Sequence, residues 1–185
     1  MITDRNEADV FKAKLIISKG ESMTEDERRE FLNGLRGAYN YTDMNRVESA
    51  TLYLCKRLFD IPKEHITLAE RLGVAWDSFF NSFHDAERYK SINAKTDWAL
   101  GDLILQKDRE RYLSNVKFVC QSHGTVHSKF PSEMDRMKVD AANAIEKSLV
   151  DLNDAVEKED ARIKNAITQT AKAWRFCGDL YGGEA

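Results

Sequence analysis

The sequence predicts an all-α protein, a bundle of about six helices with an unusually long C-terminal helix. Its 185 residues include two prolines and nine glycines, and 42% of them are hydrophobic and 32% charged, a composition typical of helical domains. Residues 132–177 contain neither glycine nor proline, and their apolar residues recur every three or four positions. At about 1.5 Å per residue this helix would be roughly 65 to 70 Å long, whereas a compact chain of this length is about 40 Å across. We therefore expect the helix either to break or to extend beyond the core.

One domain of ordinary size accounts for the whole chain, residues 1–185. A chain of this length can bury about 70% of its unfolded surface without disulfides or metal ions. We expect N-terminal helices in residues 1–61, central helices in 62–130 and the long C-terminal helix in 132–177.

Two short helices are expected first. The first should cover residues 4–19, with Thr3 or Asp4 as its cap and Gly20 at its end. Its inward residues are expected to be Val10, Phe11, Leu15 and Ile16.

Thr24 and Glu27 form the sequence pattern of a capping box and should open the second helix. This helix should end near Gly34 or Gly37. A third helix should run from Thr42 to Pro62, with Cys55 beside an inward stripe formed by Met44, Val47, Thr51, Leu54 and Leu58.

Pro62 is well placed as the first residue of a central helix that continues to about Tyr89. This helix would carry four large aromatic residues on one broad face, which indicates a position at the centre of the core. The inward residues are Ala69, Leu72, Trp76, Phe79, Phe80, Phe83 and Ala86.

A further helix is expected from Ala94 to Ser122, ended by Gly124. Its inward residues are Trp98, Leu105, Tyr112, Val116 and Val119. Residues 123–131 form the longest expected loop.

Ser132 should then cap the long C-terminal helix. The pair Asn153–Asp154 is the best candidate for a break, although charge pairs of Asp154 with Lys158 and Asp160 with Lys164 favour continuity. Its apolar stripe consists of Met134, Met137, Ala141, Ile145, Leu149, Leu152, Val156, Ile163, Ile167, Thr170, Trp174 and Cys177.

The charge pattern excludes some common functions. The formal net charge is −3 and is spread evenly, which argues against bulk electrostatic binding to nucleic acid or to an anionic membrane. The three cysteines are far apart and indicate reduced thiols in a cytoplasmic protein. The N-terminus does not resemble a signal peptide, and no apolar run is long enough to span a membrane.

Residues 66–74 resemble the first helix and turn of a helix-turn-helix DNA-binding protein. Ala69 lies four residues before the turn glycine, Gly73, with apolar residues on either side. The following segment departs from the family, because Ala75 replaces the usual cap and residues 76–84 contain no arginine, lysine or glutamine to contact DNA. A single core helix explains the same residues.

Cys120, His123 and His127 are the nearest approach to a metal site. A structural zinc site needs four ligands, and a distant residue such as Cys177 would have to supply the fourth. The alternative is that Cys120 is a core thiol and both histidines are solvated. The chain contains no phosphate-binding loop, no dinucleotide fingerprint and no nucleophile elbow. We therefore expect no metal, no cofactor and no enzymatic activity, although an enzyme or metalloprotein centred on these three residues remains the third alternative.

A non-enzymatic protein-interaction module is the leading functional hypothesis. An amphipathic helix that is too long for the core requires something to cover its apolar stripe, either a protein partner or a second copy. The candidate binding residues are Leu149, Leu152, Val156, Ile163, Ile167 and Trp174. The alternative is a DNA-binding transcriptional regulator that uses residues 66–83.

Overall fold

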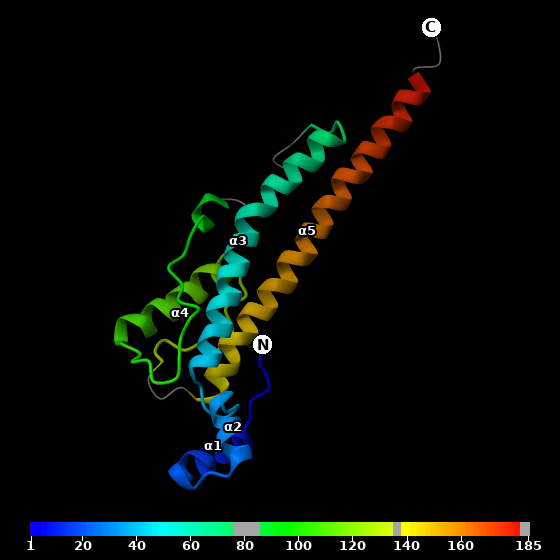
Figure 1. Cartoon of the computed structure of the whole chain (residues 1–185). Helices are drawn as coiled ribbons and strands as arrows, with labels where there is room; N and C mark the ends of the chain where they lie inside the picture. Colours follow the sequence, from blue (N-terminus) through cyan, green and yellow to red (C-terminus); the bar gives the residue numbers. More distant parts are fainter. Residues whose placement is uncertain (76–85, 135–137, 182–185) are drawn as a thin grey trace. The chain divides into compact units, whose positions relative to one another are not determined.

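The computed structural model describes residues 1–75, 86–134 and 138–181, with side chains as far as residue 177. Within these ranges the chain forms five α-helices and no strand (Figure 1). The helices are α1 (Glu7–Lys19), α2 (Glu25–Leu32), α3 (Tyr41–Arg71), α4 (Gln106–Gln121) and α5 (Val139–Tyr181), and short 3-10 helices lie at Gly20–Ser22 and Ala86–Tyr89. The all-α prediction is confirmed, with five described α-helices in place of about six.

The chain divides into two compact units, each assembled from two separate segments. Unit 1 comprises Met1–Leu54 and Ile92–Leu152, and unit 2 comprises Cys55–Ser91 and Asn153–Ala185. Helices α3 and α5 each contribute their first part to unit 1 and their second part to unit 2. The expectation of a single domain stays a prediction.

Helix α1 begins later than predicted, because its cap is Asn6 and not Thr3 or Asp4. The Asn6 side chain accepts hydrogen bonds from the amides of Ala8 and Asp9, and the Asp9 carboxylate accepts one from the Asn6 amide. Ala13 and Ile16 are buried with Leu35, but Phe11 and Leu15 are 64% and 49% exposed, so their predicted inward position is wrong.

The predicted capping box of Thr24 and Glu27 is present at the start of α2. The chain after this helix returns close to α1 at Gly37. A Cβ atom at Gly37 would lie 1.9 Å from the carbonyl oxygen of Asp9, so only glycine fits there.

Helix α3 buries the predicted stripe. The buried residues are Met44, Val47, Thr51, Leu54, Cys55 and Leu58. The predicted end at Pro62 is wrong, because α3 continues through this proline for another nine residues to Arg71. Pro62 removes one backbone hydrogen bond, but the buried stripe continues across it, with Ile61 before the proline and His65 and Ala69 after it, all at most 1% exposed.

Gly73 ends α3, so the predicted continuous helix from Pro62 to Tyr89 is also wrong. The amide of Val74 donates to the carbonyl of Ala69 and that of Gly73 to Glu70, the two bonds of a Schellman motif. Gly73 has the positive φ of 69° that this motif requires. The predicted inward residues Trp76, Phe79, Phe80 and Phe83 lie outside the described residues.

Residues 94–105 do not form the predicted helix. Gly101 adopts a positive φ of 94°, and α4 begins only at Gln106. Trp98 is buried as expected although its segment is irregular, whereas Leu105 is 42% exposed. The remaining predicted core residues of α4, Tyr112, Val116 and Val119, are buried, and the helix ends with a Schellman motif at Gly124 as predicted.

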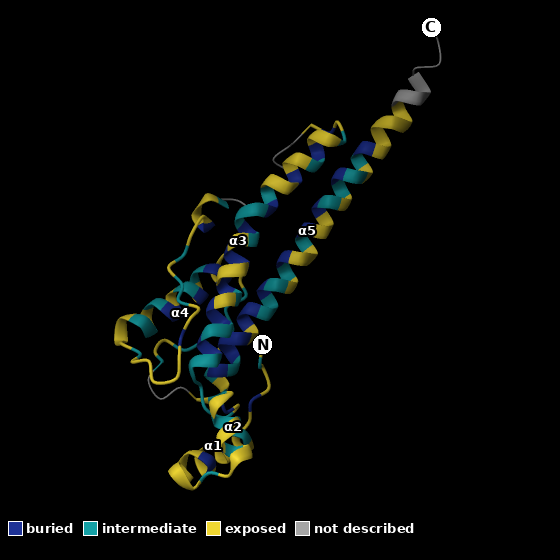
Figure 2. Ribbon diagram, in the orientation of Figure 1, coloured by how far each residue is buried: buried dark blue, intermediate teal, exposed yellow. Residues whose placement is uncertain are grey.

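Helix α5 begins at Val139 and not at the predicted cap Ser132, and then continues without interruption for 43 residues. The candidate break at Asn153–Asp154 is absent. Of the two charge pairs expected there, Asp160 and Lys164 are joined at 2.8 Å. Buried residues recur along one side of the helix, whereas its last described turns are exposed on all sides (Figure 2). No described helix is both long enough and apolar enough to cross a bilayer.

Candidate interaction site on helix α5

The six candidate binding residues have two different environments. Trp174 is 51% exposed, whereas the other five are at most 1% exposed. The five are Leu149 and Leu152 in unit 1 and Val156, Ile163 and Ile167 in unit 2. In this structure the chain itself covers most of the stripe, and a partner-binding role for these residues stays a prediction.

The position at which burial ends is explained by the end of α3. Within unit 2, α3 lies beside α5 and runs in the same direction (Figure 1). Glu64 of α3 pairs with Lys164 of α5 at 3.2 Å, and α3 ends seven residues later, at Arg71. Because both helices advance by about 1.5 Å per residue, this register allows α3 to cover α5 only to about Ala171. Among the side chains of α5 that are described, as far as residue 177, Ala171 is the last buried one, with 5% exposed.

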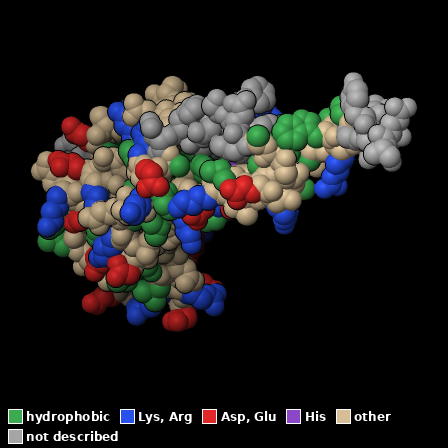
Figure 3. Space-filling model, turned by 90° about the horizontal axis from the view of Figure 1, so that it is seen from above, with side chains coloured by type: hydrophobic (Ala, Val, Ile, Leu, Met, Phe, Trp, Pro, Cys, Tyr) green, Lys and Arg blue, Asp and Glu red, His purple; other side chains and the backbone are tan. Residues whose placement is uncertain are grey.

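Beyond Ala171, every described side chain of α5 is exposed, from Lys172 to Cys177. Trp174 and Phe176 are 51% and 68% exposed. Because successive residues of a helix are about 100° apart, these two aromatic rings point to nearly opposite sides. Figure 3 shows hydrophobic and basic side chains together on the surface of this segment. These six residues are therefore a solvent-exposed helix end with an aromatic ring on each of two sides, and we call them the α5 tip.

A buried charge cluster holds α3 and α5 together in unit 2. His65 and Asp160 are 1% and 6% exposed, and the imidazole Nε2 lies 2.7 Å from the Asp160 carboxylate. The other Asp160 oxygen accepts from Lys164 at 2.8 Å, and Arg57 lies 3.5 Å away. Arg57 and Lys164 also both pair with Glu64. This cluster fixes the register that leaves the α5 tip uncovered.

The pKa shifts in this cluster fit a neutral histidine beside an ionised aspartate. Burial lowers the pKa of His65 and outweighs the opposing effect of Asp160. Burial opposes ionisation of Asp160, but the hydrogen bonds from Lys164 and His65 outweigh it and lower the pKa of the carboxyl group. At neutral pH the His65 Nε2–H therefore donates to the Asp160 carboxylate.

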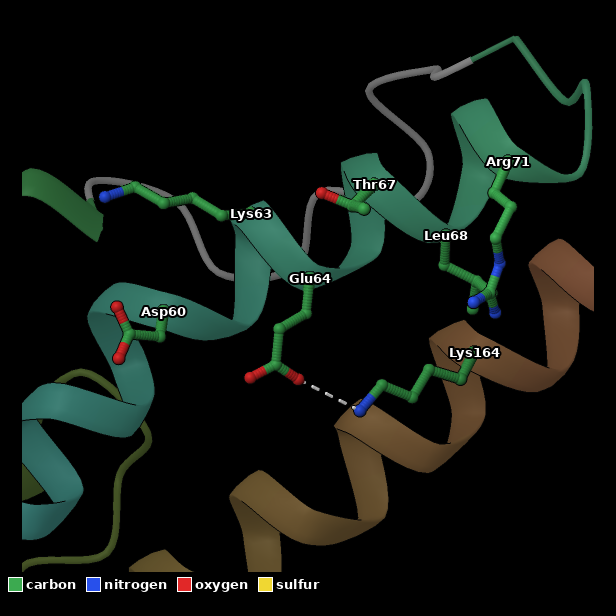
Figure 4. A pocket seen from close by; sticks show the side chains of 7 residues that line it. All are labelled: Asp60, Lys63, Glu64, Thr67, Leu68, Arg71 and Lys164. Atoms are coloured by element: carbon green, nitrogen blue, oxygen red, sulfur yellow. Dashed lines mark hydrogen bonds and ion pairs between the residues drawn. The ribbon is translucent and has the colours of Figure 1, made fainter.

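An open groove of about 680 Å³ is lined in part by Glu64 and Lys164 of this cluster (Figure 4). Three basic and two acidic side chains line it, and Leu68 and Arg71 extend toward α5. The lining residues are Asp60, Lys63, Glu64, Thr67, Leu68, Arg71 and Lys164. Glu64 and Lys164 neutralise each other within the groove, so it lacks the concentrated charge of one sign that would select an ionic ligand.

Buried ion pairs also hold α3 and α5 together in unit 1. Glu146 of α5 is 0% exposed and accepts from Arg46 at 2.7 Å, from Arg5 at 2.8 Å and from the Ile2 amide at 2.5 Å. Arg5 also pairs with Asp43 at 2.5 Å. Burial opposes ionisation of Glu146, but the hydrogen bonds from Arg46 and Ile2 lower the pKa of this carboxyl group. Through Ile2 and Arg5, the cluster binds the N-terminal segment to α3 and α5, and its role is structural.

A second buried carboxylate positions the irregular segment before α4. Glu48 of α3 forms a bidentate pair with Arg111, with both distances 2.9 Å. It also accepts hydrogen bonds from the amide of Lys95 and the indole of Trp98. Asn45 adds two hydrogen bonds to the backbone of Trp98. All donors around Glu48 belong to the protein itself, so this site too is structural.

Sequence reasoning missed these buried charges, because charged faces of helices are usually solvated. One signal was present for Glu48, Glu146, His65 and Asp160: each lies three or four positions from a core residue of the same helix. His65 lies between Ile61 and Ala69, and Asp160 between Val156 and Ile163. A charged residue in the middle of an apolar stripe indicates a buried ion pair.

Cys120, His123 and His127 do not form a joint site. Cys120 is buried, and burial raises the pKa of its thiol to about 12, so the thiol is protonated at neutral pH. His127 Nδ1 accepts a hydrogen bond from the amide of Lys129, and His123 Nδ1 lies 3.0 Å from the hydroxyl of Ser122. Within the described ranges, no group of three or more histidine, cysteine, aspartate or glutamate side chains is arranged to hold a metal ion.

The segment that resembles a helix-turn-helix is only partly described. Ile66 to Arg71 form the end of α3, Ala69 and Val74 are buried, and Gly73 makes the turn. The expected recognition helix, residues 76–83, lies outside the described residues. The DNA-binding alternative therefore stays a prediction.

Comparisons with protein-family models, with curated proteins and with solved structures found no match to this chain.

Proposed function

We propose that the protein is a non-enzymatic interaction module that binds a protein through the α5 tip. The observation that carries the proposal is the exposure of Trp174, which continues the buried stripe of Ile163 and Ile167 beyond the end of α3. Large aromatic side chains are among the residues that contribute most to protein interfaces. The tip offers one on each side of the helix, Trp174 and Phe176.

The energetics favour a protein partner over a small ligand. The α5 tip is a convex helix end, whereas small molecules bind in enclosed pockets that bury most of their surface. Burial of one large aromatic side chain removes up to about 150 to 250 Å² of surface from water. A partner with an apolar groove would bury Trp174, and Lys172 and Arg175 would meet acidic residues at its rim.

The test is the substitution Trp174→Glu, with Ser114→Glu in α4 as the matched control. Both substitutions add one negative charge at an exposed position of a helix. Tagged wild-type and variant proteins are incubated with an extract of the source cells, and the retained proteins are quantified. We expect Trp174→Glu to lose at least one protein that the wild type and Ser114→Glu both retain. The same retained proteins for all three would refute the proposal.

The DNA-binding alternative has one supporting observation. The turn at Gly73 leaves the basic side chains of Lys63 and Arg71 on the exposed side of α3. A DNA-binding role predicts salt-dependent affinity for duplex DNA that falls when Arg71 and Arg88 are replaced by alanine. Absence of binding at low salt would eliminate it.

A further inference from the structure

Outside its buried stripe, α5 carries exposed charged residues along its length within unit 2. The exposed acidic residues Asp154 and Glu157 lie near the start of this segment, and the exposed basic residues Lys172 and Arg175 lie near its end. Among the described residues, Asp154, Lys172 and Arg175 form no ion pair, and Glu157 interacts electrostatically with Arg57 of α3. We call this surface, residues 154–176 on the exposed side of α5, the outer face.

The spacing of the outer face is that of a helix–helix contact. Asp154, Ala161, Thr168 and Arg175 are each seven residues apart, and Glu157 and Lys172 lie beside this row. A row with a seven-residue repeat stays on one side of two helices that wrap around each other. At the middle of the row, Ala161 and Thr168 are small, so a second helix can approach closely.

We infer that the outer face pairs with the outer face of a second copy of this chain, with the two α5 helices antiparallel. This inference deepens the proposed function, because it names a second copy as one partner of α5. A twofold axis between residues 164 and 165 places Asp154 opposite Arg175 of the partner subunit and Glu157 opposite Lys172 of the partner subunit. Symmetry repeats both contacts, so the interface contains four pairs of opposite charge.

Charge complementarity determines the direction of pairing. A parallel pair in register places Asp154 opposite Asp154 of the partner subunit and Lys172 opposite Lys172 of the partner subunit. Like charges across such a contact are destabilising. The antiparallel arrangement replaces every one of these contacts with an attractive one. It also places Phe176, 68% exposed, against the first turn of the partner's outer face, which covers an otherwise solvated ring.

Cysteine cross-linking tests the antiparallel register. The exposed native thiol is first removed by Cys177→Ser, and Ala161→Cys and Thr168→Cys are then introduced in separate chains. The proposed register places residue 161 opposite residue 168 of the partner subunit. Two copies of residue 161 would lie about 10 Å apart along the axis, too far for a disulfide. We expect mild oxidation to link a mixture of the two variants into a covalent dimer and to link neither variant alone. Equal linkage of the single variants, or no linkage of the mixture, would overturn the register.

Charge reversal tests the interface independently. Lys172→Glu with Arg175→Glu should halve the molar mass in solution, and addition of Asp154→Lys with Glu157→Lys should restore the dimer. The control Arg28→Glu with Lys56→Glu makes the same change in net charge at exposed positions elsewhere and should leave the mass unchanged. Restoration of the dimer in the quadruple variant also shows that Lys172→Glu and Arg175→Glu are compatible with the fold.

The outcomes separate this inference from the proposed function. A dimer that survives charge reversal but is lost in Trp174→Glu would overturn antiparallel pairing through the outer face and would leave the α5 tip as the binding site. A protein that is monomeric at every concentration would overturn the inference, and the retained proteins of the Trp174→Glu experiment would then decide the proposed function alone.

Discussion

Removal of the Glu146 carboxylate should destabilise the protein more than removal of any exposed charge. Glu146 is 0% exposed and accepts hydrogen bonds from two arginines and one backbone amide. In Glu146→Ala, Arg5 retains Asp43 as its one carboxylate, and its side chain is only 3% exposed, so water cannot replace the lost partner. Loss of one partner of a buried ion pair costs about 3 to 5 kcal/mol. Glu146→Gln retains one acceptor oxygen and should cost less, about 1 to 3 kcal/mol.

Urea unfolding followed by helical circular dichroism measures this loss. With a denaturant dependence of about 2 kcal/mol per M, Glu146→Ala should lower the unfolding midpoint by about 1.5 to 2.5 M. The matched control is Glu159→Ala in the same helix, which removes an exposed pair with Arg162 and should cost less than about 1 kcal/mol. If the unfolding free energies of Glu146→Ala and Glu159→Ala agreed within about 0.5 kcal/mol, the reasoning that this cluster is buried and essential would be refuted.

Three further predictions follow from single positions. Ile163→Ala should cost about 2 to 5 kcal/mol in unfolding free energy, because Ile163 is 0% exposed; an unchanged thermal midpoint would contradict its place in the core. Because burial holds the pKa of His65 below its ordinary 6.5, its contribution to stability is present above pH 6.5 and is lost as pH falls. As pH is lowered from 6.5, the unfolding free energy should fall more steeply in the wild type than in His65→Gln. Parallel plots of unfolding free energy against pH for the two proteins would argue against a buried neutral imidazole. Gly73→Ala should cost about 1 kcal/mol through the positive φ alone, since a Cβ there has no neighbour within 4 Å; a more stable Gly73→Ala variant would show that α3 does not end in this motif.

Periodicity predicted the cores of α3 and α5, because a helix beside another helix buries one side along its whole covered length. Met44, Val47 and Leu58 in α3, and Ile145 and Ile163 in α5, are buried as their spacing indicates. The same rule holds for Tyr112 and Val116 of α4. These positions depend only on the helical repeat, which the sequence contains directly.

Helix ends were predicted less well, because tertiary contacts override local signals. Pro62 does not end α3, since buried residues on both sides of it keep the helix packed. Residues 94–105 have a helical pattern but take an irregular path, because Glu48 and Asn45 capture the backbone amides of Lys95 and Trp98. Neither interaction can be predicted from the sequence alone, since each joins residues about fifty positions apart.

The candidate site was predicted only in part for a similar reason. The sequence shows one stripe from Leu149 to Trp174, but it does not show which portion of this stripe the chain itself covers. That boundary depends on Gly73, which ends α3, and on the register fixed by Glu64 with Lys164 and by His65 with Asp160. An apolar stripe that binds a partner and one that packs in the core have the same sequence pattern. They differ in whether another part of the chain packs against them.

The most direct test of whether α5 joins two copies of the chain is absolute molar mass by light scattering across a dilution series at low salt. We expect a mass twice the chain mass of 21.2 kDa at high concentration, with dissociation on dilution and on addition of salt. The ratio of absorbance at 260 and 280 nm on the same peak should be that of protein free of nucleic acid. A mass of 21.2 kDa at every concentration would contradict self-association through α5.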